Sequence, residues 1–227
     1  MLEYPILIFM LFALFVATII LLINYFSTKN RIRRKLKKIK PTAILSCKEN
    51  QYVKIIGKAH NLKPALISPL SKKPCVYYQV EVERRRSSGD SNTWHTIIKD
   101  EQFIDFSIDS KGQKAIVAAK VPENAKKVYL TKDFKKSSGT FNDAPDYIEN
   151  YLKTFEKSSQ GFLGLNHDMR YREGIIEIGE EIAVLGIAKF RESEYNLDHY
   201  SSTDLFISGD PERKLFITDD QKTVQQL

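Results

Sequence analysis

The sequence predicts a mainly β protein, in which an N-terminal transmembrane helix precedes an antiparallel, barrel-like or sandwich-like domain with one inserted amphipathic helix. Three observations predict this fold class: an apolar run near the N-terminus, short segments of period-two alternation, and one central stretch with apolar residues at helical spacing. They divide the 227 residues into a transmembrane anchor at 1–28, a basic juxtamembrane segment at 29–40 and a β-rich domain at 41–227, with the helical insertion near 143–157.

The apolar run covers residues 6–23 and is interrupted only by the weakly polar Thr18. At about 1.5 Å per residue, a helix from Tyr4 to Phe26 is roughly 34 Å long, which suffices to cross a hydrocarbon core of about 30 Å. Tyr4 and Tyr25 stand at the two ends, where tyrosine rings suit the membrane interface. The run therefore predicts a membrane span.

A cleaved signal peptide is the alternative interpretation of this run. Such a peptide has a positively charged start, a shorter apolar core and a small-residue cleavage site. Here the first five residues carry a single charge, Glu3, and the run is followed by Asn24-Tyr25-Phe26-Ser27. We therefore expect an uncleaved, single-pass anchor.

A dense basic segment directly follows the run, with eight cations in twelve residues and no acid among them. These cations are Lys29, Arg31, Arg33, Arg34, Lys35, Lys37, Lys38 and Lys40. By the positive-inside rule we expect the N-terminus outside and the C-terminal domain in the cytoplasm. The segment also suits contact with anionic headgroups of the lipid bilayer, although a plain topology signal is favoured over specific lipid recognition.

Without these eight cations and Glu3, the chain holds 27 Lys and Arg against 27 Asp and Glu. The predicted domain is thus formally neutral, and no nucleic-acid partner is expected, because nucleic-acid binding needs a basic face on the folded domain. The one other basic cluster, residues 84–86, runs into Ser-Ser-Gly-Asp and predicts a solvated hairpin tip.

Metal and disulfide chemistry are not indicated. Cys47 and Cys75 are too few for a disulfide-stapled scaffold, and in a reducing compartment we expect them to be free and buried. The histidines are scattered, and no pair has the spacing typical of a zinc site. These are His60, His95, His167 and His199. No cofactor is predicted.

The clearest strand covers residues 76–84, where Val76, Tyr78, Val80 and Val82 alternate with polar residues and predict one buried and one wet face. Residues 61–74 hold three prolines and predict an irregular loop. Further strands are expected at 52–59, 94–98, 103–108, 114–118, 128–130, 171–188 (two strands), 204–208 and 214–218, before a polar tail. Short strands separated by turn signals favour antiparallel pairing.

The exception lies at residues 145–157, where a capping sequence ending in Pro145 precedes apolar residues at helical spacing. Polar, glycine-containing segments flank this predicted helix. One interpretation is a cover over the sheet, which we favour; the other is a mobile flap that presents Phe141, Phe155 and Phe162 to a protein partner.

Several pieces of the sequence, in this order, resemble the GIDE (beside-a-membrane) domain family, which includes the mitochondrial E3 ubiquitin ligase MULAN. The pieces are Val53-x-Ile55-x-Gly57, Leu66-Ile67-Ser68-Pro69, Trp94 with Phe103-Ile104-Asp105-Phe106, Tyr171-x-Glu173-x-Ile175-x-x-x-Gly179-Glu180, Val184-x-Gly186 and Leu215-Phe216-Ile217-Thr218. The resemblance implies a β-rich module beside a membrane. The ligase relatives also carry a RING with eight zinc ligands, which two cysteines cannot supply.

The functional prediction is a membrane-anchored, non-enzymatic binding or sensing module with a membrane-protein partner. One alternative is membership of the RING-type ligase family in name only. Another is a membrane-anchored enzyme that uses residues such as His95 or His167, although no nucleophile elbow, paired motif or metal spacing organises them.

Overall fold

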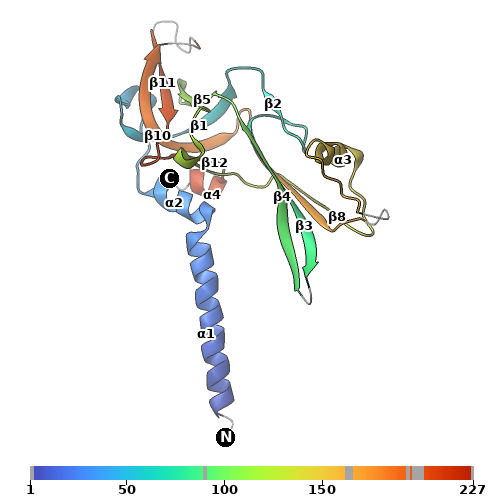
Figure 1. Cartoon of the computed structure of the whole chain (residues 1–227). Coiled ribbons are helices and arrows are strands. Elements are labelled where there is room, and N and C mark those ends of the chain that lie inside the picture. The colour runs from blue at the N-terminus through green and yellow to red at the C-terminus, as the bar shows by residue number, and fades with distance from the viewer. Residues whose placement is uncertain (1–2, 89–90, 162–165, 193–194, 196–201, 226–227) are drawn as a thin grey trace.

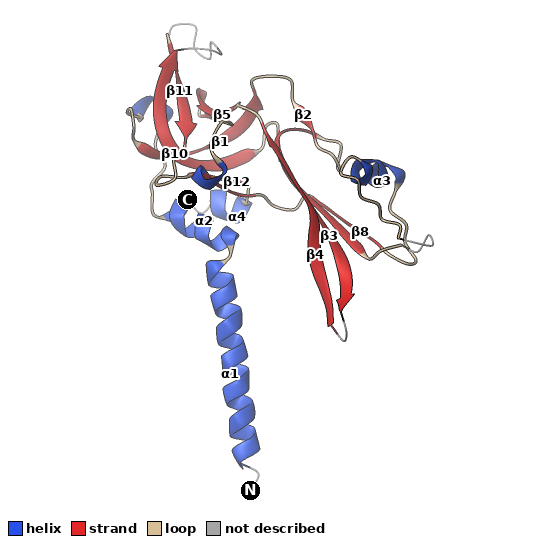
Figure 2. Cartoon of the chain, in the orientation of Figure 1, coloured by secondary structure: helices blue, strands red, loops and turns tan. Residues whose placement is uncertain are grey.

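The computed structural model describes residues 3–88, 91–161, 166–192, 195 and 202–225. Figure 1 shows a long helix, α1 (Glu3–Phe26), which projects alone from a body of two β-sheets. Figure 2 shows that strands dominate this body. The predicted fold class, mainly β with an N-terminal apolar helix and a helix inserted between strands, is confirmed.

Helix α1 is long and apolar enough to cross a membrane over Ile8–Phe26, and none of that stretch is buried against the rest of the chain. The hydroxyl of Thr18, within this stretch, is paired, because it donates to the carbonyl oxygen of Leu14 at 2.8 Å. A signal sequence passes the same test of length and composition.

Five strands close into a barrel. The order is β1-β5-β6-β11-β10, and β10 pairs again with β1. Numbered along the chain, this is 1-2-3-5-4, the Greek-key connectivity of small OB-type barrels. The barrel strands are β1 (Tyr52–Asn61), β5 (Phe106–Ser110), β6 (Gln113–Val117), β10 (Glu181–Glu192) and β11 (Thr203–Ser208).

Two more strands extend this sheet: β12 (Leu215–Thr218) pairs with β10, and β7 (Lys126–Tyr129) pairs with β12. The expected antiparallel pairing holds for most of the sheet, but β6–β11 and β7–β12 are parallel. Parallel pairing needs a long crossover, and here some 85 residues separate each strand from its parallel neighbour.

Strand β10 is buried on both faces. Ile182, Val184 and Ala188 belong to the barrel core, whereas Ala183 and Leu185 belong to a second cluster on the outside of the barrel. This two-sided burial explains the nearly continuous apolar run of the strand. Opposite it, Gly57 of β1 lacks a side chain because a Cβ there would lie 2.1 Å from the carbonyl oxygen of Asp109.

The second sheet is open. Its order is β2-β3-β9-β8, and β4 pairs with β3. Helix α3 (Asp146–Lys153) covers one face, where Ile148 and Leu152 join a core with Tyr78, Val80 and Val82. The strands are β2 (Leu66–Ile67), β3 (Pro74–Ser88), β4 (Ser91–Phe103), β8 (Phe134–Ser138) and β9 (Met169–Glu177).

Strand β3 changes faces at an irregularity in its pairing with β9, between Cys75 and Tyr77. Beyond it, Tyr78, Val80 and Val82 face α3 as predicted, whereas Val76 and Tyr77 belong to the barrel core. The prediction that Val76 shares one face with the other three is therefore wrong, because the bulge reverses the alternation.

The proline-rich loop before β3 is held by a buried carboxylate. Glu173, fully buried on β9, accepts hydrogen bonds from the backbone amides of Leu70 and Ser71 at 2.7 and 2.8 Å. Cys75 is buried nearby and Cys47 is buried beside the barrel; both are free thiols, as expected.

Five further elements differ from the expectations. Strand β8 lies in the segment predicted to be a polar flank, and α4 (Gln221–Val224) replaces the predicted polar tail and buries Val224. Helix α3 is shorter than predicted, and Pro145 is its N-cap residue rather than a first-turn proline. Two single turns of 3-10 helix lie at Ile44–Ser46 and Glu123–Ala125.

Candidate membrane-proximal site

A second helix, α2 (Thr28–Lys37), follows α1 after the single residue Ser27. The Asn30 amide donates to the carbonyl oxygen of Asn24 at 2.7 Å, and the Arg34 guanidinium donates to that of Tyr25 at 2.7 Å. Arg34 also lies over the Tyr25 ring, 3.9 Å from its centroid. These contacts add donors to carbonyls at the C-terminal end of α1 and bring positive charge to its negative pole. Side chains, not only backbone, thus join the two helices.

Helix α2 is packed into the body of the protein. Ile32 and Leu36, one turn apart, are 1% and 0% exposed and contact the outer face of the barrel sheet. At the end of the helix, the buried Lys54 of β1 donates its ammonium to the carbonyl oxygen of Leu36 at 3.0 Å. Burial lowers the pKa of Lys54. Residues 28–37 are thus part of the folded body rather than a tether outside it.

The predicted interface residues have several different environments. Lys29 forms an ion pair of 2.7 Å with the buried Asp220 of the β12–α4 turn, and this hydrogen bond raises the pKa of Lys29. Arg34 is bound at the helix junction, and Arg33 also has an interaction partner. The side chains of Lys37, Lys38 and Lys40 are exposed. Tyr4 and Tyr25 lie near the two ends of α1.

The remaining two cations, Arg31 and Lys35, are one turn apart on α2 and line a small cleft with a volume of about 240 Å³. Lys127 of β7 and Lys214, just before β12, line the same cleft, which we call the basic cleft. Its other lining residues are Tyr52, Phe216 and one acid, Glu212.

The basic cleft is held together by backbone and ring contacts. Lys127 is the parallel-strand partner of Phe216 in the β7–β12 pairing. The Tyr52 hydroxyl donates to the carbonyl oxygen of Lys214 at 2.6 Å, and the Lys35 ammonium lies 5.9 Å from the centroid of the Tyr52 ring. Three segments distant in sequence therefore bring their cations to one place.

The four cations of the basic cleft repel one another. Burial lowers the pKa of Lys127, and the neighbouring charges of Arg31 and Lys214 lower it further. Among the residues that the structure describes, no ion pair within 4.0 Å joins Glu212 to any of the four. The arrangement therefore favours binding of an anion.

Sequence reasoning identified Arg31 and Lys35 as interface residues but not Lys127 or Lys214. These two lysines lie in stretches with nearby acids, Glu123 and Glu212, and nothing local distinguishes them from surface lysines. Only the parallel pairing of β7 with β12, which no local pattern announces, places them beside α2.

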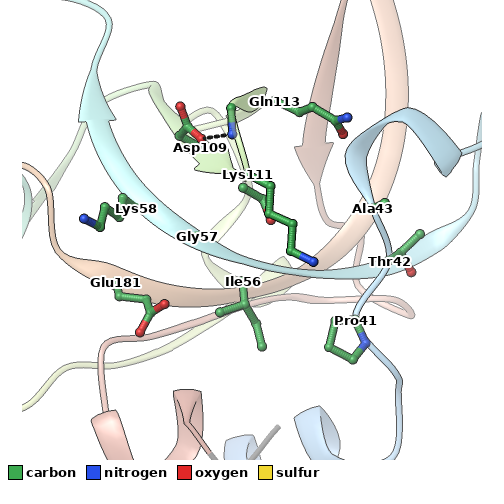
Figure 3. Close-up of a pocket in the computed structure, with 12 residues that line it drawn as sticks. Pro41, Thr42, Ala43, Ile56, Gly57, Lys58, Asp109, Lys111, Gln113 and Glu181 are labelled. Carbon is green, nitrogen blue, oxygen red and sulfur yellow. Dashed lines mark hydrogen bonds between the residues drawn. The ribbon is translucent and has the colours of Figure 1, made fainter.

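A larger cavity of about 700 Å³ lies beside β1, at residues 56–58 (Figure 3). It opens between β1, the β5–β6 turn and the segment at 41–43, and its charged lining residues are Lys58, Lys111, Asp109 and Glu181. Two cations and two anions leave no net charge, and Asp109 is engaged with the backbone amide of Gly112 at 2.8 Å. This lining shows no preference for one class of ligand.

Two of the three predicted partner-binding aromatics are placed by the structure. Phe141 is fully exposed in the turn after β8, and Phe155 is 37% exposed beyond α3 with its ring edge against Tyr151. Phe162 lies outside the described residues. Helix α3 buries Ile148 and Leu152, so it covers the open sheet as favoured above, while Phe141 remains available to a partner.

Within the described residues, catalytic groups do not converge. His95 is exposed and bonds to Thr93, 2.9 Å from its Nε2 atom. A shallow pocket is lined by Ser87, His167 and Asp168, but the Ser87 hydroxyl donates to Asn92 at 2.6 Å and Asp168 pairs with Arg85 at 3.2 Å. Desolvation lowers the pKa of His167. No described group of three or more His, Cys, Asp or Glu residues could hold a metal ion.

Two carboxyl groups, the half-buried Glu180 and the buried Asp219, lie where the barrel meets the second sheet. Burial raises the pKa of Glu180, in the β9–β10 turn, to about 7, and that of Asp219, at the end of β12, to about 6. Asp219 accepts hydrogen bonds from the amide and hydroxyl of Thr131, and Glu180 accepts one from the amide of Glu177 at 2.9 Å. The Asp219 bonds join two segments that are distant in sequence, whereas the Glu180 bond lies within the β9–β10 turn.

Comparison with protein-family models, curated proteins and solved structures finds no match to this chain. The resemblance to the GIDE family therefore stays a prediction.

Proposed function

We propose that the protein is a single-pass, membrane-anchored binding or sensing module without catalytic activity, with its N-terminus outside and its folded body in the cytoplasm. The observation that carries this proposal is the contrast between α1, exposed along Ile8–Phe26, and the helix directly after it, which packs Ile32 and Leu36 into the body. An exposed apolar helix of that length is stable only in lipid or against a partner. The eight cations at its C-terminal end support a cytoplasmic body.

A topology experiment tests the anchoring. A reporter active only in the cytoplasm, fused after Leu227, should be active, and the protein should stay in the membrane fraction after alkaline extraction. The intact mass should include residues 1–28, which distinguishes an anchor from a cleaved signal peptide. Activity of an exported reporter at the same position would reverse the proposed orientation.

The partner is proposed to be another membrane protein that contacts the surface around Phe141 and Phe155. A fully exposed phenylalanine next to an amphipathic helix supports an interaction surface at this end of the molecule. Photo-crosslinkers at Phe141 and Phe155 in native membranes should give the same adduct of defined mass.

A matched control for this experiment is Lys114, which is exposed on the barrel strand β6. It is a better control than Gln79 or Glu81 on the predicted wet face, because both are half-buried and bonded to neighbours. An adduct formed from Lys114 but from neither phenylalanine would move the partner site to the barrel.

Ubiquitin transfer by a RING-type mechanism is the competing function that the family resemblance raises. It requires two bound zinc ions held by eight ligands. We expect the purified protein to contain less than one zinc per chain and to transfer no ubiquitin. Stoichiometric zinc, or transfer by the isolated protein, would replace the binding function with an enzymatic one.

A further inference from the structure

We propose that the basic cleft binds the phosphate group of an anionic phospholipid from the membrane in which α1 is anchored. This inference rests on the proposed anchoring and adds a ligand class and a site to it. The residues that hold the phosphate are Arg31, Lys35, Lys127 and Lys214.

Charge is the first argument. The cleft places four cations against the single acid Glu212, although the chain outside the basic segment is formally neutral. Other cations of the same segment are already neutralised, as Lys29 is by Asp220. An anion in the cleft relieves the mutual repulsion of its cations, and a guanidinium beside ammonium groups is a common arrangement for phosphate.

Position is the second argument. Arg31 lies in the first turn of α2, five residues after Phe26, where the membrane-spanning stretch ends. The hydrogen bonds of Asn30 and Arg34 to the end of α1 fix α2 close to that boundary. Headgroups of the cytoplasmic leaflet lie at this level, whereas the α3 cover lies on the second sheet, away from α1 (Figure 1).

Size is the third argument. A cleft of about 240 Å³ accommodates a phosphate headgroup but not acyl chains, which remain in the bilayer. Tyr52 and Phe216 are the aromatic lining residues of the cleft, and the Tyr52 hydroxyl is already bonded to the carbonyl oxygen of Lys214. The selectivity is therefore expected to come from headgroup charge rather than from chain length.

The test uses the purified full chain in a neutral maltoside detergent, titrated with dioctanoyl phosphatidic acid. Native mass spectrometry should show one tightly bound lipid per chain, and acylation of the Lys127 and Lys214 amines should slow as the lipid binds. Dioctanoyl phosphatidylcholine tests the need for net charge. Inorganic phosphate at the same concentration distinguishes a free anion from a lipid.

The decisive variant is Lys127→Gln with Lys214→Gln. At about 1 kcal/mol for each lost contact of an ammonium group with the phosphate, removal of both should weaken binding of the lipid about 30-fold. Lys37→Gln with Lys40→Gln makes the same charge change on exposed positions of the basic segment that do not line the cleft, and should weaken binding less than about threefold. Arg31→Gln with Lys35→Gln should repeat the loss from the α2 side, which guards against misfolding of the strand variant.

Three results would overturn the proposal. Equal weakening by the Lys37 and Lys40 variant would show diffuse charge rather than a site. Equal protection by inorganic phosphate would show a free-anion site, and equal binding of phosphatidylcholine would show no role for headgroup charge. This test is done in detergent, so its outcome does not depend on the topology experiment. A cytoplasmic body combined with no lipid selectivity would refute the lipid site in the cleft and leave the proposed anchoring in place.

Discussion

Helices α2 and α3 bury the same two types of residue but pack against two different regions of the molecule. Each places an isoleucine and a leucine four residues apart against a sheet: Ile32 and Leu36 on the closed barrel, and Ile148 and Leu152 on the open sheet. Their polar sides differ. Helix α2 carries only positive charges, whereas α3 carries Asp146, Glu149 and Lys153.

The charge density of a helix and the burial of its side chains are therefore independent properties. Eight cations around α2 suggest a solvated segment, yet two buried aliphatic side chains suffice to fix its inner side. In α2 the buried pair positions a charged surface directly after the apolar helix α1. In α3 an equivalent pair covers one face of the open sheet and completes the core on that face.

The largest expected effect tests whether both helices are structural. Leu36→Ala and Leu152→Ala each leave a cavity in a fully buried position and should each lower the free energy of unfolding by about 2–5 kcal/mol. Urea unfolding of the full chain in neutral detergent, followed by circular dichroism, measures this. Lys37→Ala, exposed beside Leu36, should change it by less than about 0.5 kcal/mol. A small effect of Leu36→Ala, together with a large effect of Leu152→Ala, would mean that α2 is a tether outside the folded body.

The next effect concerns the place where the two regions meet. Glu180 and Asp219 keep their protons in the folded protein up to about pH 7 and pH 6, whereas the unfolded chain releases them near pH 4 to 4.5. The folded state thus holds more protons within this window, so the free energy of unfolding should fall as the pH rises from about 4.5 to 7. Unfolding at several pH values should show this slope.

Glu180→Gln removes one of the two titrating groups and should flatten that slope. Glu192→Gln, at the exposed end of β10, is the control and should leave it unchanged. An unchanged slope in the Glu180 variant would mean that the pH dependence arises elsewhere than at the meeting point of the sheets.

A smaller effect is expected at the junction of α1 and α2. Arg34→Ala removes a hydrogen bond to Tyr25 and a ring contact, together worth about 1 kcal/mol. The distance between spin labels at Ile23 and Lys48 in lipid nanodiscs should become more broadly distributed. Lys38→Ala serves as the control. Equal widths of the distance distribution in both variants would show that the packing of α2 against the barrel alone fixes the angle between α1 and the body.

The smallest effect is expected at Phe141. Because this side chain is fully exposed, Phe141→Ser should change the free energy of unfolding by less than about 0.5 kcal/mol while it reduces crosslinking to the partner. Thermal unfolding measures the first quantity. A substantial loss of stability would assign Phe141 to the fold rather than to a binding surface.

The parts of the fold that follow from local periodicity were predictable. Tyr78, Val80 and Val82 alternate over a long strand, and residues 182–188 form an uninterrupted apolar strand, so both elements were found. Strand β8 was missed because Lys135 and Lys136 have no strand signature; its pairing with β9 makes it a strand. The reversal at Val76 depends on a bulge that a two-residue period cannot reveal.

Only the part of the candidate site that lies on α2 was predictable from the sequence. The cations of α2 stood out as a run, but their division into paired, exposed and cleft-lining groups depends on Asp220, Lys127 and Lys214, which lie far away in the chain. Helix α2 was hidden for a similar reason, since Ile32 and Leu36 are too few to suggest burial until the outer face of β10 is known.

The hairpin of β3 and β4 extends from the body in the same direction as α1 (Figures 1 and 2). In a bilayer, the tilt of a spanning helix adjusts to membrane thickness at low cost. A flexible linker would absorb that tilt, but α2 is bound to both α1 and the barrel. With α1 in a bilayer, as proposed, a change in membrane thickness would therefore tilt the whole body together with α1, and the hairpin would move toward or away from the lipid surface.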